Sequence, residues 1–195
     1  MLWLLILIVA VLGGAWIGYR VNRDRRPALP APESTALLER TLKDVRPNDI
    51  VQHDGKDYLV EGVITYDEDG HTWRCARMVD AGVETWLLVG LERGGPLTTR
   101  MLTPSALEVT GYPTEAIDKG GVSYKLDKRG TATATFQGDL PGMPSPGEGG
   151  SVRCRWWKYT AVGEKVLIVE QWGEAYRAMA GETVKEGDVE LLAAS

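Results

Sequence analysis

The pattern of apolar and polar positions changes abruptly near residue 20. From Met1 to Tyr19 there is no charged side chain, and Leu2 to Val11 is continuously apolar. A helix over residues 1–19, with a rise of about 1.5 Å per residue, spans about 28 Å, which is enough to cross the hydrocarbon core of a bilayer. A basic cluster follows this run instead of preceding it, which favours a membrane anchor over a cleaved signal peptide. Residues 1–19 therefore predict a single transmembrane helix.

Beyond residue 46 the apolar residues lie in short runs that are rich in β-branched and aromatic residues and are separated by Gly- and Pro-containing turns. At 131–137 and 153–159 the side chains alternate with a period of two. The pattern predicts strands at 49–51, 58–66, 73–79, 84–89, 97–103, 121–126, 131–137, 153–159, 164–170, 174–180 and 188–191. A turn is predicted at 127–130, and the Gly- and Pro-rich residues 138–150 are predicted to form a mobile surface loop. Gly62 lies inside a strand, which indicates a bulge or a close backbone approach.

Two of the predicted hairpins have similar sequences. Arg74-Cys75 precedes Arg153-Cys154 by 79 residues (153 − 74), and an apolar second strand follows each pair. The chain is therefore expected to be mostly β, with one pseudo-duplicated antiparallel β-domain at 47–195. Its halves would be about 47–106 and 107–195, joined as a barrel or as a sandwich.

The segments between the anchor and the β-domain have distinct compositions. Residues 20–32 form a basic and Pro-rich linker, and its arginines predict a cytoplasmic β-domain with the N-terminus outside. Residues 33–46 predict a short amphipathic helix, whose stripe of Leu38, Leu42 and Val45 would pack on the β-domain. Gly14 and Gly18 have the GxxxG spacing that can pair two membrane helices, which allows a dimer through them.

Charge and composition narrow the function classes. The formal net charge is −5, and the linker cluster contributes +3 (four Arg against Asp24), so the rest of the chain carries −8. This acidity argues against nucleic acid as a partner. The two His lie at predicted turns, and no serine-nucleophile or phosphate-loop motif occurs, so we expect no enzyme activity, metal or cofactor. Cys75 and Cys154 are either small buried thiols or a disulfide; their spacing is unlike that of a zinc site.

The predicted strand 153–159 supplies the candidate binding site. Alternation places its arginines and two of its aromatic residues on one face, opposite Val152, Cys154 and Trp156. Arg and aromatic groups together can hold an anion or stack a planar ligand; alternatively, the arginines pair with Glu170 across the hairpin. The candidate binding residues are Arg153, Arg155, Trp157, Tyr159, Glu170 and Trp172.

From about Val45 to the C-terminus, the sequence resembles the bacterial family of uncharacterised domains known as domain of unknown function 4178. The residues that carry the resemblance are Asp49-Ile50-Val51, Gly55, Tyr58 to Gly62, Tyr66, Gly70, Trp73, Trp86-Leu87, Gly120-Gly121, Tyr124, Gly138, Arg153 to Tyr159, Leu167 to Gly173 and Gly181. The sequence departs from the pattern at Cys75 and Gly90. The resemblance implies no activity, but it implies an association with small membrane proteins, membrane-stress proteins and polyamine aminopropyltransferases.

Together these patterns predict a single-pass membrane protein whose cytoplasmic β-domain is a binding or adaptor module for protein partners, in a membrane-stress or polyamine-linked system. The alternatives are a sensor for a small cationic metabolite, suggested by the −8 charge, and an enzyme of unknown class.

Overall fold

The structure is a computed structural model that describes residues 40–109, 111–144 and 150–194. The predicted anchor, the GxxxG residues, the linker and residues 33–39 lie outside the described residues. Among the residues described, the structure has no helix long and apolar enough to span a bilayer. The elements are η1 (Leu42–Asp44), β1 (Ile50–His53), β2 (Lys56–Glu68), β3 (His71–Asp80), β4 (Val83–Val89), β5 (Thr99–Pro104), β6 (Ala116–Lys119), β7 (Val122–Gly138), β8 (Val152–Thr160), β9 (Lys165–Trp172), β10 (Ala175–Val184), η2 (Glu186–Asp188) and β11 (Val189–Leu192).

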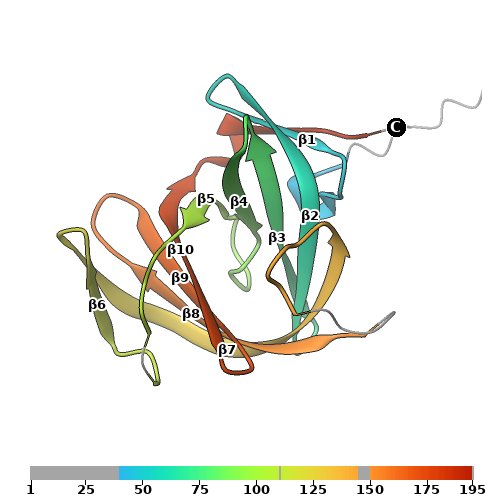
Figure 1. Cartoon of the computed structure of the whole chain (residues 1–195). Coiled ribbons are helices and arrows are strands. Elements are labelled where there is room, and N and C mark those ends of the chain that lie inside the picture. The colour runs from blue at the N-terminus through green and yellow to red at the C-terminus, as the bar shows by residue number, and fades with distance from the viewer. Residues whose placement is uncertain (1–39, 110, 145–149, 195) are drawn as a thin grey trace, which may run out of the picture. The chain divides into compact units, whose positions relative to one another are not determined.

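The strands form one antiparallel sheet that closes on itself (Figure 1). The order is β11-β1-β2-β3-β4-β5-β10-β9-β8-β7-β6, and β2 also pairs with β7 over residues 62–67 and 133–138. Strands β2, β3, β4, β5, β10, β9, β8 and β7 therefore make an eight-stranded barrel, extended outside the ring by β1, β11 and β6. Of the two predicted all-β architectures, the barrel is the observed one.

Side chains alternate between the interior of the barrel and its outer surface, as the strand period requires. The interior is filled mainly by large apolar groups, among them Tyr66, Trp73, Trp86, Trp156 and Trp172. Outside the ring, one apolar cluster lies over β2, β3 and β4 beneath η1 and β11, and another lies over β8, β9 and β10 beneath β6.

Cys75 and Cys154 both belong to the interior cluster, and both are buried free thiols. Burial raises the pKa of each thiol well above its ordinary value, because an apolar interior disfavours the thiolate. The structure thus contains the buried thiols, not the disulfide.

The predicted helix at 33–46 is not present in its described part. Residues 42–44 form only a single 3-10 turn, with Asp44 accepting hydrogen bonds from Thr41, and the chain is extended again at Val45. Asp49 accepts hydrogen bonds from Arg40 and from the Arg46 backbone N–H, which holds this segment as a turn. Leu42 and Val45 are nevertheless buried against the barrel, where the stripe was expected to pack.

The predicted turn at 127–130 is also wrong, because β7 runs through it with one bulge between Leu126 and Lys128. Gly130 is required there for close packing. A Cβ atom at this position would lie 2.9 Å from the Trp156 ring and would also meet the Glu68 carboxylate. The glycine that suggested a turn in the sequence therefore marks the close contact of a strand with an interior indole.

Residues 139–144, here called the cap segment, form no strand or helix, in agreement with the loop predicted at 138–150, and they pack onto the barrel. Leu140 and Met143 pack against the interior cluster, and the Asp139 N–H donates to the Glu61 carbonyl at 2.8 Å. Gly62 makes this possible: β2 has a bulge at Val60–Gly62, and a Cβ atom on Gly62 would lie 2.6 Å from Leu140 Cγ. The prediction of a bulge or close approach at Gly62 is confirmed on both counts.

Candidate functional site

The barrel wall opens between β4 and β10, where β5 ends. Strand β5 pairs with β4 only from Trp86 to Val89 and with β10 only from Met179 to Val184. The beginnings of β4 and β10 therefore have no strand between them. A pocket of about 800 Å³ occupies this gap and is called here the wall pocket. It is lined by Glu84, Trp86, Pro104, Ser105, Ala106, Leu107, Pro141, Gly142, Met143, Pro144, Trp172, Ala175, Tyr176, Arg177 and Ala178.

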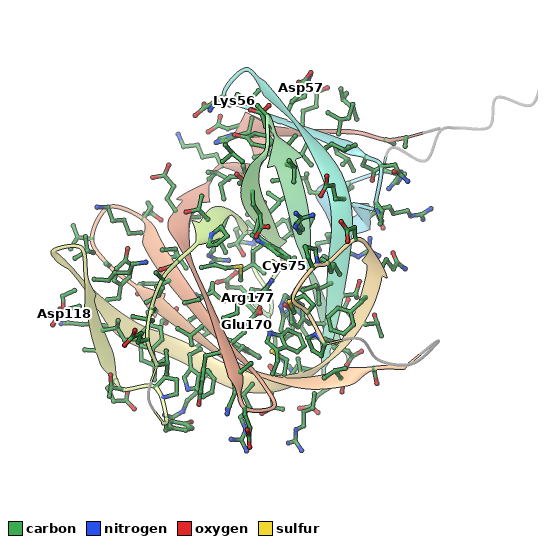
Figure 2. The ribbon with its side chains drawn as sticks, in the orientation of Figure 1. Lys56, Asp57, Cys75, Asp118, Glu170 and Arg177 are labelled. Carbon is green, nitrogen blue, oxygen red and sulfur yellow. The ribbon has the colours of Figure 1, made fainter. Side chains whose placement is uncertain are left out.

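A buried ion pair lies beside the wall pocket, inside the ring of strands (Figure 2). Glu170 on β9 and Arg177 on β10 are cross-strand partners, and Arg177 donates to Glu170 Oε2 through Nε at 3.0 Å and Nη2 at 2.5 Å. Glu170 also accepts the Tyr66 hydroxyl proton at Oε1, at 2.7 Å, and the Trp172 indole N–H at Oε2, at 3.1 Å.

These donors explain how a carboxylate is accommodated in an aromatic interior. A buried charge without partners would cost several kcal/mol, whereas this carboxylate receives a cation and two neutral donors. Burial, the largest single influence, lowers the pKa of Arg177, but the charge and hydrogen bond of Glu170, together with Tyr66 and Cys75, outweigh burial, so the pKa lies above its ordinary value. Burial, followed by the charge of Glu170, raises the pKa of Tyr66 well above its ordinary value. Both shifts favour the protonated form of each group, which is the form that donates to Glu170.

A second set of contacts fixes the wall of the pocket. The Arg177 guanidinium lies 4.2 Å from the centroid of the Trp86 ring, a cation–π arrangement. The Trp86 indole N–H donates to Glu84 Oε1 at 2.7 Å, and Arg77 Nε donates to Glu84 Oε2 at 3.0 Å. Arg77 also pairs with Glu61 at the same end of the barrel. Both charged residues of the lining, Glu84 and Arg177, are thus paired with opposite charges.

Two polar atoms of the lining residues have no partner within the described part of the chain. They are Ser105 Oγ and Arg177 Nη1, and both atoms are buried. Most buried polar groups in proteins are hydrogen-bonded, so two unsatisfied groups among the residues of one pocket are unusual. The Ser105 backbone N–H is satisfied separately, by the Ala178 carbonyl at 2.9 Å.

Another charged cluster lies at the end of β5 away from the wall pocket. Glu92 pairs there with Arg100 and with Lys158 Nζ at 2.7 Å, and Lys158 Nζ also lies 2.6 Å from Asp127. Burial raises the pKa of Glu92, but hydrogen bonds from Arg100, Lys158 and Thr98 outweigh burial and lower the pKa to about 2. Because every charge in this cluster has a partner, we assign the cluster a role in stabilising the barrel and not in binding a ligand.

The six residues proposed from the sequence fall into three places. Trp172 lines the wall pocket, and Glu170 lies beside it as the acceptor of the Trp172 indole N–H. Trp157 and Tyr159 share the outer face of β8 with the two arginines, as alternation predicts, but both are buried in the cluster beneath β6. The Tyr159 hydroxyl donates to the Thr114 carbonyl at 2.8 Å.

Arg153 and Arg155, in contrast, are exposed on the outer face of β8. In the register of the barrel they lie opposite Thr133 and Thr131 of β7, and the ion-pair partner of Glu170 is Arg177 instead. The structure therefore does not bring the exposed arginines and the aromatic residues of β8 together on one open surface.

Sequence reasoning missed Arg177, Trp86 and Ser105. One signal for Arg177 was available: the two-residue turn Gly173-Glu174 places residue 177 opposite residue 170 in a hairpin, so a cross-strand ion pair follows from turn geometry. Nothing in the local sequence indicates that Trp86 and Ser105 reach the same pocket, because the pairing of β5 with β10 is long-range.

The two histidines are engaged at turns. His53 Nδ1 lies 2.9 Å from the Asp188 carbonyl oxygen, and His71 Nε2 lies 3.2 Å from that of Leu91. Over the described ranges, no group of three or more His, Cys, Asp or Glu side chains could hold a metal ion.

The fold and the site define a closed antiparallel β-barrel with a wall pocket beside a buried Arg–Glu pair. Residues 46–186 match the family described as "Domain of unknown function (DUF4178)", and the chain belongs to this family. It is similar to uncharacterized protein Rv2597 of Mycobacterium tuberculosis (strain ATCC 25618 / H37Rv) and to uncharacterized protein Mb2628 of Mycobacterium bovis. Each is 27% identical over 201 residues, covering 98% of this chain and 96% of the relative. No solved structure matches the chain.

Proposed function

We propose that this β-barrel is a ligand-binding module and that the wall pocket is its binding site. The observation that carries the proposal is the pocket itself: about 800 Å³ of space against Trp86, Trp172 and Tyr176, beside a buried ion pair. Ligand sites are typically concave and mostly apolar, with a few placed polar groups, and have volumes of about 300–1,000 Å³. The expectation that the chain is not an enzyme stays a prediction.

The test uses three small probes with the same ring and different charge: neutral benzamide, anionic benzoate and cationic benzamidinium. Each would be titrated into full-length protein with ¹⁵N-labelled tryptophan, and the indole N–H signals of Trp86 and Trp172 would be followed by NMR. Nine non-hydrogen atoms support a dissociation constant on the order of 1 mM. We expect at least one probe to shift both signals saturably.

Blocking variants show whether the shifts come from the wall pocket. Ala106 lines the pocket and is exposed, so Ala106→Trp fills the space without disturbing the interior. The matched control is Ala193→Trp, at an exposed position outside the lining. The proposal requires that Ala106→Trp abolishes the shifts and that Ala193→Trp retains them. If none of the three probes moves either indole signal, the wall pocket is not a ligand site.

Residues 1–19 are proposed to attach this module to a membrane as a single-pass helix, with the N-terminus outside and the barrel in the cytoplasm. The support is the uncharged span and the basic cluster that follows it. An Arg at the centre of such a helix costs about 3 kcal/mol, so Ile8→Arg should move the full-length protein from the membrane pellet to the soluble fraction. Equal fractionation of Ile8→Arg and the natural chain would contradict the anchor.

A second candidate function, docking of a protein partner in a membrane-stress or polyamine-linked system, is favoured by the exposed Arg153 and Arg155 on β8. Crosslinking in membranes tests it. Arg155→Glu should remove a crosslinked partner that the control Arg46→Glu, at another exposed arginine, retains. Retention by both variants would exclude this surface.

The two halves of the barrel are further proposed to be a duplication. Within β1 to β5, and again within β6 to β10, each strand pairs antiparallel with the next strand in the sequence. The two sets of strands pair with each other along β5–β10 and β2–β7. Superposition of residues 71–93 on 151–173 tests this: a match in which Cys75 overlies Cys154 supports a repeat, and a shifted register would not.

A further inference from the structure

We propose that the ligand of the wall pocket is a neutral, planar molecule that carries a hydrogen-bond acceptor such as an amide or ketone carbonyl. This inference rests on the proposed function, since it names the ligand class of the same pocket. It follows from three properties of the lining: its charge balance, its aromatic walls and its unpaired hydrogen-bonding groups.

The charge balance argues for a neutral ligand. Glu84 and Arg177 are the charged side chains of the lining, and their charges cancel. Each is also already paired, Glu84 with Arg77 and Arg177 with Glu170. A charged ligand group would have to leave water without gaining a free counter-charge, and an uncompensated charge is costly to bury.

The walls argue for a flat ligand. Trp86, Trp172 and Tyr176 contribute aromatic surface, and Pro104, Pro141, Pro144 and Met143 contribute apolar surface on the side of β5 and the cap segment. The Trp86 and Trp172 indole N–H groups are already bonded to Glu84 and Glu170, so these residues offer rings but no free donors. Stacking and dispersion against rings favour a planar body.

The unpaired groups argue for an acceptor. Ser105 Oγ and Arg177 Nη1 are buried without a hydrogen-bond partner in the described chain, and both can donate. The Ser105 hydroxyl turns about its Cα–Cβ bond, so it can reach a carbonyl oxygen placed in the pocket. An incoming acceptor would repair an unsatisfied group, and this gain is absent for a ligand without one.

The same three probes test the ligand class. We expect benzamide to bind at least threefold more tightly than both benzoate and benzamidinium, which share its ring and shape. If benzoate or benzamidinium binds more tightly than benzamide, the ligand is not neutral, although the pocket is still a binding site. Tighter binding of benzamidinium is the result expected of a sensor for a cationic metabolite. The absence of shifts with all three overturns the proposed function itself.

Ser105→Ala tests the acceptor contact. Ser105 makes no side-chain hydrogen bond in the described structure, so the variant should keep or slightly raise the melting temperature. It should weaken benzamide binding about fivefold, the value of one net hydrogen bond. The control, Ser123→Ala at an exposed position of β7, should change neither quantity. Unchanged benzamide affinity in Ser105→Ala would refute the assigned contact.

Discussion

The pairing of Glu170 with Arg177 makes the barrel interior dependent on a single cross-strand contact. Arg177→Met removes the cation and keeps a long unbranched side chain. It leaves the Glu170 carboxylate, whose side chain is only 4% exposed, with Tyr66 and Trp172 as its remaining donors. Removing one partner of a buried pair typically costs about 3–5 kcal/mol, because the other charge stays buried.

This cost is a large part of the stability of a domain, which is usually about 5–15 kcal/mol. For a domain of this size, 1 kcal/mol corresponds to about 2–4 °C, so Arg177→Met should lower the melting temperature by about 10 °C. Glu170→Leu should be as damaging on its own. The double variant Glu170→Leu/Arg177→Met should recover at least about 2 kcal/mol of the summed loss, since neither charge remains.

Denaturant unfolding of the full-length protein, followed by near-ultraviolet circular dichroism, measures these changes. The matched control is the exposed pair Arg129–Glu115 at 3.3 Å, with side chains 50% and 79% exposed. Glu115→Gln should cost less than about 0.5 kcal/mol. A loss below about 1 kcal/mol in Arg177→Met, or strictly additive single and double variants, would refute the view that Glu170 is buried and depends on Arg177.

Three further predictions concern other parts of the barrel. The pKa of Glu92 is lowered to about 2, below its ordinary value, so its stabilisation is complete above about pH 5 and is lost as the pH falls toward 2. Glu92→Gln should therefore flatten the acid limb of a stability–pH curve, and an unchanged limb would contradict the pairing. Gly62→Ala should displace the cap segment and cost about 2–4 kcal/mol in thermal unfolding, whereas Gly187→Ala, where a Cβ atom meets nothing within 4 Å, should be nearly neutral. Cys75 and Cys154 should react with a thiol reagent only on unfolding, because both are buried and burial raises their pKa values; rapid labelling of the native protein would show an open interior.

Much of the strand content could be predicted because each barrel strand has one face inside and one outside, and this geometry imposes a period of two on the sequence. Closure could not be predicted in the same way. It depends on the pairing of residues 62–67 with 133–138, about 70 positions apart, and local patterning does not specify such a contact. The turn predicted at 127–130 was wrong for a related reason. Gly130 allows the strand to contact Trp156, and a local sequence pattern does not distinguish this use of glycine from a turn.

For the candidate site, too, features set by neighbouring residues could be predicted from the sequence, whereas features set by long-range contacts could not. Alternation correctly placed Trp157 and Tyr159 on the same face of β8 as Arg153 and Arg155, but it carries no information on whether a distant segment covers that face. The sequence suggested Glu170 as a partner of Arg153 or Arg155 across the hairpin, but its observed partner is Arg177. That partner, Arg177, follows from the hairpin turn, whereas the contribution of Ser105 depends on where β5 meets β10.

The position of the wall pocket follows from the end of β5. Pro104 has no N–H and is the last β5 residue to pair with β10, which suits a position where a ladder stops. Beyond it the chain turns across the gap as Ser105 to Leu107 and leaves Trp86 and Arg177 facing the opening. Ligand affinity and barrel stability should therefore be separable. Ser105 and Ala106 take no part in the Glu170–Arg177 ion pair, so substitutions there should change ligand affinity with little loss of stability. Arg177 belongs to both the pocket and the interior, so substitutions there should change both.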